Sequence, residues 1–175
     1  MVRTNLKHVP IIKHHVSLIG RRGQGVEYYR YYEDILKEKQ AMRHEWLELY
    51  LNVIKQLKKH GIKIDGKSIL DISGEPGFFA KDLKAHAKDV TVTAFADNVA
   101  RAITKILNVN SLVYDFQKDN LVSIFGEKRF DLIFAIYCLN FCIDLTKFFV
   151  ELNKVLKNGG YFYVAFVESS RAPLA

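Results

Sequence analysis

A turn of small residues between an apolar segment and a helical segment is the place where this chain could bind a ligand. The turn reads Asp71-Ile-Ser-Gly-Glu-Pro-Gly77 and follows the apolar residues Ile69 and Leu70. A turn of this kind lets the backbone approach a ligand closely and presents free amides at the start of the next helix. An acid at its first position would repel a pyrophosphate, so Asp71 favours a cationic ligand, or an ammonium group held through water.

Strands and helices that alternate along the chain must position this turn. Strands that are apolar on both faces predict a parallel sheet covered by helices on both sides, which is an α/β fold. Such a sheet binds ligands beyond the carboxyl ends of its strands, near the point where the strand order reverses. The strands are expected at 67–72, 90–96, 111–114, 130–136 and 161–167, the helices at 76–86, 98–107 and 145–156, and a turn at 157–160.

The segment that precedes this alternating pattern has a different character. Residues 1–25 are basic and irregular, which predicts a loop or arm, and residues 28–60 are expected to form a helix in two pieces. We therefore divide the chain into a basic arm with a helical lid at 1–66 and a core at 67–175. The apolar residues that recur at helical spacing are Trp46, Leu47, Leu49, Tyr50, Val53, Ile54 and Leu57.

The composition is that of a soluble globular protein with room for one sizeable core. Of the 175 residues, 49% are hydrophobic and 26% are charged, and the net charge is +7. Residues 1–67 hold 14 Lys or Arg against 7 acids, whereas residues 68–175 hold 12 of each. The basic excess is either an attractive face for an anionic substrate or an ordinary solvated surface. Nucleic acid stays open as a partner but is not favoured, because no Arg/Lys run with interleaved aromatics is present.

Membrane, disulfide and metal sites are not expected. No apolar run reaches the roughly 18 residues that cross a bilayer. The first 20 residues lack the apolar core of a secretion signal, so we expect a cytoplasmic location. Cys138 and Cys142 lie in one apolar stretch and are expected to be reduced, buried thiols. No Cys or acid completes a metal-ligand set with His8, His14 and His15.

The turn at 71–77 resembles the first motif of the class I S-adenosylmethionine-dependent methyltransferases. That motif reads apolar-apolar-Asp-apolar-Gly-x-Gly-x-Gly, and the resemblance implies that the turn wraps the amino acid part of the cofactor. Two positions depart from it, because Ser73 replaces the first glycine and Glu75 replaces the second. Glu75 places a bulky anion where the backbone approach is usually tight, so it either contacts the ammonium group of the cofactor or weakens binding.

Four further segments continue the resemblance over residues 67–167. The end of the second strand normally carries an acid for the ribose hydroxyls, and here Ala96 takes that place with Asp97 one residue late. After the third strand, Asp115 would accept from the adenine amino group and Phe116 would supply a neighbouring amide. The stretches 130–140 and 155–162 match the fourth strand and the turn into the fifth. The cofactor-binding residues implied are Asp71, Ser73, Gly74, Glu75, Gly77, Phe78, Asp97, Asn98, Asp115, Phe116 and Tyr137.

Candidate substrate residues lie on the N-terminal helix and after the fourth strand. Tyr28, Tyr29 and Tyr32 form either a lid over the cofactor or a stripe that packs this helix onto the sheet. Asn140 could orient a nucleophile by hydrogen bonding, but an amide is not a general base. Its loop lacks the Asn/Asp-Pro-Pro-aromatic signature by which the base-amino methyltransferases grip a nucleobase, which argues against a nucleic-acid acceptor.

The resemblance implies a three-layer, Rossmann-like methyltransferase sandwich with a mostly parallel sheet and an N-terminal helical extension. The family usually has seven strands, whereas five are expected here, so either the C-terminal strands are truncated or the protein is naturally short. A bare strand at the sheet edge would invite pairing in a homodimer.

The resemblance also implies an enzyme that uses S-adenosylmethionine and yields S-adenosylhomocysteine. The acceptor would be a small molecule, a lipid or a glycan, and no catalytic residue is assigned. A degenerate methyltransferase-like module that binds or scaffolds without catalysis is the alternative. A dinucleotide-dependent oxidoreductase is disfavoured, because the turn lacks Gly-x-Gly-x-x-Gly spacing.

Overall fold

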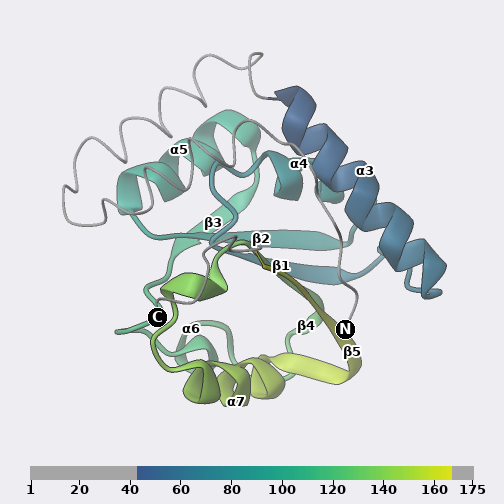
Figure 1. Cartoon of the computed structure of the whole chain (residues 1–175). Helices are drawn as coiled ribbons and strands as arrows, with labels where there is room; N and C mark the ends of the chain where they lie inside the picture. The colour runs from purple at the N-terminus through teal and green to yellow at the C-terminus, as the bar shows by residue number, and fades with distance from the viewer. Residues whose placement is uncertain (1–42, 167–175) are drawn as a thin grey trace, which may run out of the picture.

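Residues 43–166 of this chain are described by a computed structural model. They contain five strands, which form one sheet in the order β3-β2-β1-β4-β5 with every neighbouring pair parallel (Figure 1). This arrangement confirms the predicted α/β fold with a parallel sheet. The strands are β1 (Ser68–Ile72), β2 (Asp89–Ala94), β3 (Asn110–Val113), β4 (Phe130–Ile136) and β5 (Leu156–Ala165).

Helices cover both faces of the sheet, so the described part of the chain has three layers. Figure 1 shows α3 (Arg43–Lys59), α4 (Phe78–Lys84) and α5 (Asp97–Leu107) on one side. The helices α6 (Leu121–Phe125) and α7 (Leu145–Val155) lie on the other, and a short 3₁₀ helix, η1 (Leu139–Phe141), follows β4.

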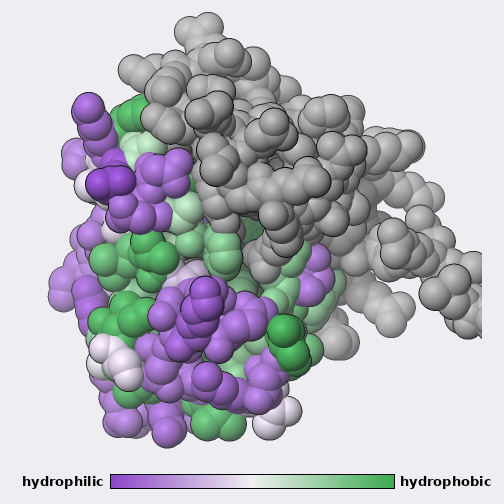
Figure 2. All heavy atoms as spheres, turned by 90° about the vertical axis from the view of Figure 1, so that its left-hand side faces the viewer, coloured by the Kyte–Doolittle hydropathy of each residue, from purple (hydrophilic) through white to green (hydrophobic). Residues whose placement is uncertain are grey.

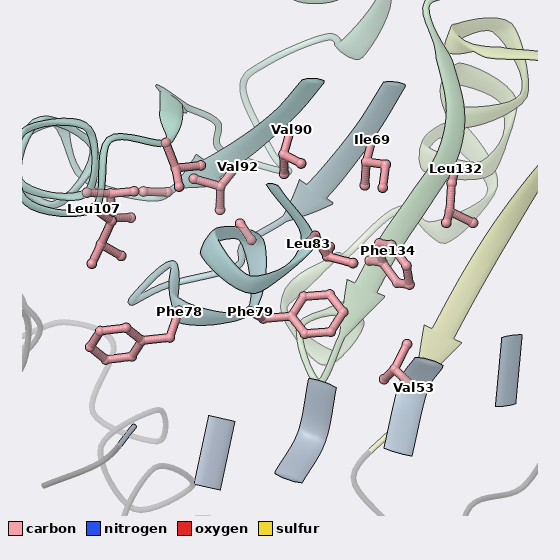
Figure 3. Close-up of a cluster of buried hydrophobic side chains, with 14 of the residues drawn as sticks. Val53, Ile69, Phe78, Phe79, Leu83, Val90, Val92, Leu107, Leu132 and Phe134 are labelled. Carbon is pink, nitrogen blue, oxygen red and sulfur yellow. The ribbon is translucent and has the colours of Figure 1, made fainter. Parts of the chain in front are cut away.

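Alternate residues of the central strand build two separate hydrophobic cores. Ile69 of β1 belongs to the core beneath α3, α4 and α5, whereas Leu70 and Ile72 belong to the core beneath α6 and α7. Figure 3 shows the first core, in which Phe79 of α4 meets Phe134 of β4 at a ring-centroid distance of 5.1 Å. Because successive side chains of a strand point to opposite faces, a strand buried on both sides is expected to be apolar throughout, as β1 is apart from Ser68 and Asp71.

The strand order reverses direction at β1. The chain passes from β1 to β2 and then outward to β3, and it returns across the sheet to β4 on the other side of β1. Asp71 therefore lies in register with Val92 of β2 and with Phe134 of β4. The loops that leave β1 and β4 diverge here, which makes this edge of the sheet the expected ligand crevice.

Helix α3 packs as the helical spacing of the sequence predicts. Val53 and Leu57 are 2% and 3% exposed, and the ring of Tyr50 meets the edge of Phe79 at 6.3 Å. The division of the chain at residue 66 stays a prediction, although α3 shares its core with the sheet. The remainder of the expected N-terminal helix lies outside the described residues.

The structure differs from the expected elements at a helix start, at a turn and in two additional short helices. Helix α4 begins at Phe78 rather than at residue 76, because Gly77 adopts a left-handed φ of 89°. The expected turn at 157–160 lies within β5, where the pairing register jumps from Phe130 with Leu156 to Leu132 with Tyr161. The short helices α6 and η1 were not expected, because five and three residues are too few to show a helical period.

The core beneath α4 should carry much of the stability of the domain. Leu83 is fully buried, so Leu83→Ala should lower the free energy of unfolding by about 2–5 kcal/mol through lost contacts and the cavity that remains. The matched control is Leu51→Ala on α3, where the side chain is 56% exposed and the expected change is within about 0.5 kcal/mol. Urea unfolding of both variants measures the difference, and equal values would contradict this assignment of the core.

Candidate functional site

The turn after β1 is held against β2 by hydrogen bonds from its own backbone. The N–H of Ser73 donates to the hydroxyl of Thr93 at 2.9 Å, and the N–H of Gly74 donates to the carbonyl of Thr93 at 3.1 Å. Ser73 adopts a left-handed φ of 51°, which turns the chain out of the strand. A serine at the first glycine position of the motif is therefore accommodated with its amide engaged.

Two glycines of the turn lie where a side chain would collide. A Cβ at Gly74 would lie 2.1 Å from the Oδ2 atom of Asp71, so the Asp71 carboxylate lies directly against this backbone. A Cβ at Gly77 would lie 2.9 Å from a methyl group of Ile103 on α5. Gly74 thus permits the approach of the carboxylate, and Gly77 permits the packing of α4 on α5. Phe78, the next residue, is buried in the core of Figure 3.

The Asp71 carboxylate is buried at the carboxyl end of β1. The residue is 2% exposed, and its Oδ2 atom has no hydrogen-bond partner in the structure. Burial first, and the negative charge of Glu75 second, raise the pKa of the Asp71 carboxyl to about 8. A buried acceptor without a donor is costly, and a buried negative charge is more so. The site is therefore prepared for a ligand that brings a donor and a positive charge.

Glu75 turns its side chain towards the end of β2. The residue is 8% exposed, and its Oε1 atom accepts a hydrogen bond of 2.6 Å from the N–H of Phe95. Phe95 lies one residue beyond the end of β2. The carboxylate of Glu75 therefore takes the place of the acceptor that a paired strand would offer to this N–H. The bulky residue at the second glycine position therefore holds the turn to β2.

Asp97 makes its described contact within its own helix. Asp97 begins α5, its side chain is 68% exposed, and its Oδ2 atom lies 2.8 Å from a guanidinium nitrogen of Arg101. Together with Arg101 it lines a groove between α5 and β3. Asn98 follows on the same first turn and is half-buried. The contacts that the structure shows for Asp97 are thus those of an outward-facing helix acid.

Asp115 and Phe116 follow β3 and are engaged in the local structure of their loop. The Asp115 carboxylate accepts from the N–H of Gln117 at 2.9 Å and lies 3.5 Å from the ammonium group of Lys118. The ring of Phe116 is buried against Phe148 of α7, with 5.4 Å between the ring centroids. Because β3 and β1 run parallel, with β2 between them, the position of both residues after β3 brings them to the same edge of the sheet as Asp71.

Tyr137 follows β4 in a strained backbone conformation. Its φ is 58°, and its N–H donates to the carbonyl of Ala165 at 2.9 Å. The hydroxyl is buried without a hydrogen-bond partner, and burial raises the pKa of Tyr137 to about 12. Asn140 lies in η1, where it is exposed. The loop after β4 therefore carries a buried hydroxyl at Tyr137 and an exposed amide side chain at Asn140, close to each other in the sequence.

Cys138 is a site residue that the sequence did not single out. Its thiol is buried and donates to the carbonyl of Ile72 at 3.3 Å, which ties the loop after β4 to the end of β1. Burial, followed by the charges of Asp71 and Glu75, raises the pKa of this thiol well above its usual value. The thiol is thus a structural donor, and both cysteines are free and buried as expected. Only its place directly after the fourth strand could have indicated this role.

The sequence also did not single out two residues near the end of β2, Thr93 and Phe95. Thr93 and the amide of Phe95 hold the turn, but neither has a sequence signature apart from its position near a strand end. The predicted lid residues Tyr28, Tyr29 and Tyr32 lie outside the described residues. The structure thus gathers Asp71, Gly74 and Glu75 at one place.

A comparison with protein families identifies the domain. Residues 70–164, more than half of the chain, match the sequence model of a family described as a methyltransferase domain. The chain belongs to this methyltransferase family. S-adenosylmethionine-dependent methyltransferases are among the solved structures that share its fold, in line with the cofactor that the turn at 71–77 predicts. A comparison with curated proteins found no match.

Solved methyltransferases share the fold at low sequence identity. An S-adenosylmethionine-dependent methyltransferase from Mesorhizobium loti is 20% identical over 63% of this chain and 50% of its own length, with a TM-score of 0.54. A methyltransferase from Aquifex aeolicus is 20% identical over 81% of this chain and 77% of its own length, with a TM-score of 0.58. A Methanococcus maripaludis protein is 18% identical over 80% of this chain and 63% of its own length, with a TM-score of 0.60. The chain spans half the length of the first and less than two thirds of the third.

The residues at the carboxyl end of β1 fit a cationic cofactor. The Oδ2 atom of Asp71 is a buried acceptor without a donor, and the cofactor carries an ammonium group. Gly74 offers backbone without a side chain beside that oxygen. Negative charge from Glu75 strengthens the attraction for a cation at the same place.

Residues 43–166 contain neither a membrane-spanning helix nor a cluster of metal-ligating side chains. No helix there has the length and apolar character needed to cross a membrane. No group of three or more His, Cys, Asp or Glu side chains in that range could hold a metal ion. The side of the molecule in Figure 2 mixes hydrophobic and hydrophilic residues. A cytoplasmic location stays a prediction.

The raised pKa of Asp71 predicts how the stability of the ligand-free protein depends on pH. The folded-state pKa of about 8 lies above the ordinary value of 3.8, so the folded protein binds the extra proton. Stability should therefore fall as the pH rises from about 4 to about 8. Asp71→Asn removes this loss, and the variant should exceed the native protein at pH 8 by at least about 1 kcal/mol. Urea unfolding at pH 4.5, 6 and 8 measures it.

The control for that experiment is Asp65→Asn, where the side chain is 73% exposed. This change should alter the unfolding free energy by less than about 0.5 kcal/mol at each pH. An Asp71→Asn variant whose stability follows the same pH slope as the native protein would show that this carboxylate is not the titrating group.

Proposed function

We propose that this domain transfers a methyl group from S-adenosylmethionine to an oxygen, nitrogen or carbon atom of a small molecule, a lipid or a glycan. The single observation that carries the proposal is the buried Asp71 carboxylate, whose Oδ2 atom has no partner at the point where the strand order reverses. When bound, the cofactor supplies an electrophilic methyl group on a positively charged sulfur.

Asp71 is proposed to hold the ammonium group of the cofactor, directly or through water. A cation next to this carboxylate favours its ionised form and offsets the cost of burying it. Gly74 keeps the backbone open at the same place, since any Cβ there would meet the carboxylate. The turn is also rigid, because Thr93 anchors both of its first two amides.

Glu75 is proposed to shape the site and to add to its negative potential. Its carboxylate is held by the N–H of Phe95, so it is fixed at the end of β2 rather than extended into solvent. The bond from Phe95 directs one carboxylate oxygen of Glu75 to the end of β2. Of the two roles that the sequence left open, we therefore favour a working acid over an obstruction.

The remaining cofactor residues are assigned by their position at the same sheet edge. Asp115 and Phe116 follow β3 and are proposed to face the adenine end of the cofactor. Ser73, Gly77 and Phe78 are proposed to contribute backbone from the turn and the start of α4. The proposed list also keeps Asn98, Tyr137 and Asp97, although the exposed ion pair of Asp97 with Arg101 makes it the weakest member.

The groups near Asp71 support catalysis by positioning rather than by proton transfer. Burial raises the pKa of the Cys138 thiol well above its usual value and that of the Tyr137 hydroxyl to about 12. Both groups therefore stay protonated at neutral pH and serve as donors. Holding two reactants in line within a closed site contributes a large part of a methyl-transfer rate, and no general base is assigned.

An anionic acceptor is the substrate class that the charge pattern favours. The excess of Lys and Arg lies in residues 1–67, ahead of the turn. Within the described residues, Lys58 and Lys59 close the last turn of α3 and are exposed. Such charge would raise the local concentration of an anionic lipid or glycan.

A binding or scaffolding module without catalysis is the second candidate. The observation that favours it is the exposed position of Asp97, which leaves the end of β2 without the usual acid facing the cofactor. This candidate keeps the cofactor turn but assigns the protein no acceptor.

Calorimetric titration with S-adenosylmethionine and S-adenosylhomocysteine tests the cofactor site. Asp71→Asn keeps the shape of the side chain but removes its charge, so affinity should fall at least about tenfold, which is about 1.4 kcal/mol. Asp65→Asn should leave the affinity unchanged. Loss of binding in both variants, or in neither, would contradict the role proposed for Asp71.

Binding should also be linked to protons. A cation favours the ionised form of Asp71, so binding at pH 6 should release up to one proton, and affinity should rise as the pH increases from 5.5 to 7. In this range the α-amino group of the ligand keeps its charge, since its ordinary pKa is about 7.7–8.0. Titrations in two buffers of different ionisation enthalpy measure the proton release. Equal heats in both buffers would contradict it.

Substitution of Glu75 separates the two candidate functions. Glu75→Gly removes the bond to Phe95 and should lower cofactor affinity at least about tenfold, because the turn loses an anchor and a charge. Glu75→Gln retains a hydrogen-bond acceptor for Phe95 and should lose less. A large gain of affinity in Glu75→Gly would mean that the natural turn obstructs the cofactor, which would favour the scaffolding module.

A further inference from the structure

A groove of about 320 Å³ lies beside β3, away from the turn that holds Asp71. One wall is α5 and the other is β3, which is the last strand at this end of the sheet among the described residues (Figure 1). We call this the β3 groove. It is lined by Asp97, Ala100, Arg101, Thr104, Lys105, Ser111, Leu112 and Val113.

The β3 side of the groove carries exposed apolar side chains and a buried hydroxyl that has no hydrogen-bond partner. Leu112 and Val113 are 38% and 39% exposed, which is unusual for apolar residues of a parallel strand. The hydroxyl of Ser111 is buried without a hydrogen-bond partner. An edge strand also leaves the N–H and C=O groups on its outer side without a ladder partner, which makes it a template for another strand.

The α5 side of the groove carries positive charge. Arg101 and Lys105 line it one helical turn apart, and Asp97 offsets one of these two charges. An extended segment that paired with β3 would run alongside this wall. Acidic side chains on that segment would face Arg101 and Lys105, so charge complementarity favours an acidic strand.

Other occupants fit the β3 groove less well. A second copy of the chain would bring Arg101 and Lys105 close to the same residues of its partner, and each copy has a net charge of +7. A nucleic acid strand needs aromatic platforms or several phosphate contacts, but no aromatic residue lines the groove and Asp97 already pairs with Arg101. A helix would leave the outer backbone groups of β3 unpaired.

We propose that the β3 groove binds an extended, acidic segment of a partner protein, which adds a strand to the sheet at β3. Main-chain hydrogen bonds to β3 supply much of the affinity in this mode of recognition, and side-chain pockets supply the specificity. The hydroxyl of Ser111 gains a polar partner, and Leu112 and Val113 are covered. The turn at 71–77 contributes no residue to the lining of the groove, and Asp97 is the one lining residue that the proposed cofactor list also names.

The test uses the full 175-residue chain and a seven-residue peptide in which glutamate alternates with valine. Amide NMR spectra recorded during titration should show shifts at Asn110–Val113 and along the adjoining wall of α5. A lysine-for-glutamate peptide should bind at least tenfold more weakly. The same acidic peptide with alternate backbone amides methylated should not bind, since it is unable to form a ladder.

The protein variant that matches this test is Arg101→Glu with Lys105→Glu. Both side chains line the groove, and the doubly reversed protein should bind the acidic peptide at least tenfold more weakly while its thermal midpoint is unchanged. Lys88→Glu, an exposed charge reversal on another part of the surface, is the control and should bind as the native chain does.

Each other outcome overturns the proposal. Equal binding of the methylated peptide would exclude strand addition, and shifts confined to other residues would place the peptide elsewhere. Displacement of the peptide by a heptathymidylate strand, with shifts at the same amides, would make the groove a nucleic-acid site. Shifts at Asn110–Val113 that depend on protein concentration without peptide would make it an interface between copies of this chain.

Discussion

The burial of one carboxylate at the end of the central strand is the constraint on which the rest of the site depends. Asp71 is enclosed on the sheet face that also carries α4 and α5, and its Oδ2 atom has no partner there. Its position excludes a side chain at residue 74, because a Cβ would lie 2.1 Å from that oxygen. The energy of an unpaired buried acid has to be offset by the packing around it, and a cationic ligand removes that cost. Ligand binding and domain stability are therefore linked through the same group.

The sheet holds this carboxylate in place from both sides. On the β2 side, Thr93 accepts from the first two amides of the turn, and the N–H of Phe95 is bonded to Glu75. On the β4 side, the thiol of Cys138 donates to the carbonyl of Ile72, directly after Asp71. Parallel strands end at a common edge of the sheet. The turn after β1, the end of β2 and the loop after β4 therefore meet at this site, and each contributes only a few groups. A turn anchored in this way loses little conformational entropy when it binds a ligand.

Two edges of the same sheet have different chemistry. The edge formed by the strand ends is acidic and buried, and burial, together with the charge of Glu75, raises the pKa of the Asp71 carboxyl. The lateral edge at β3 is open, with Arg101 and Lys105 beside it. The cationic cofactor and the acidic segment that we propose would therefore meet opposite charges at two different edges of the sheet. The two surfaces are separated by α5, which contributes Ile103 to the packing of Gly77 and Arg101 to the groove.

The sequence by itself determined the elements and the cofactor turn, whereas the tertiary structure decided which way the side chains of the site point. β4 has the predicted bounds, and the apolar strands made a parallel sheet predictable, because burial on both faces leaves a continuous apolar pattern. The resemblance of residues 69–77 to the first motif of the class I methyltransferases likewise indicated the ligand. The resemblance did not show that Glu75 reaches Phe95 or that Asp97 faces Arg101. It also gave no sign that Cys138 would bond to Ile72. Those directions depend on backbone groups that lie next to the residue only after distant strands have paired, and local periodicity carries no information about them.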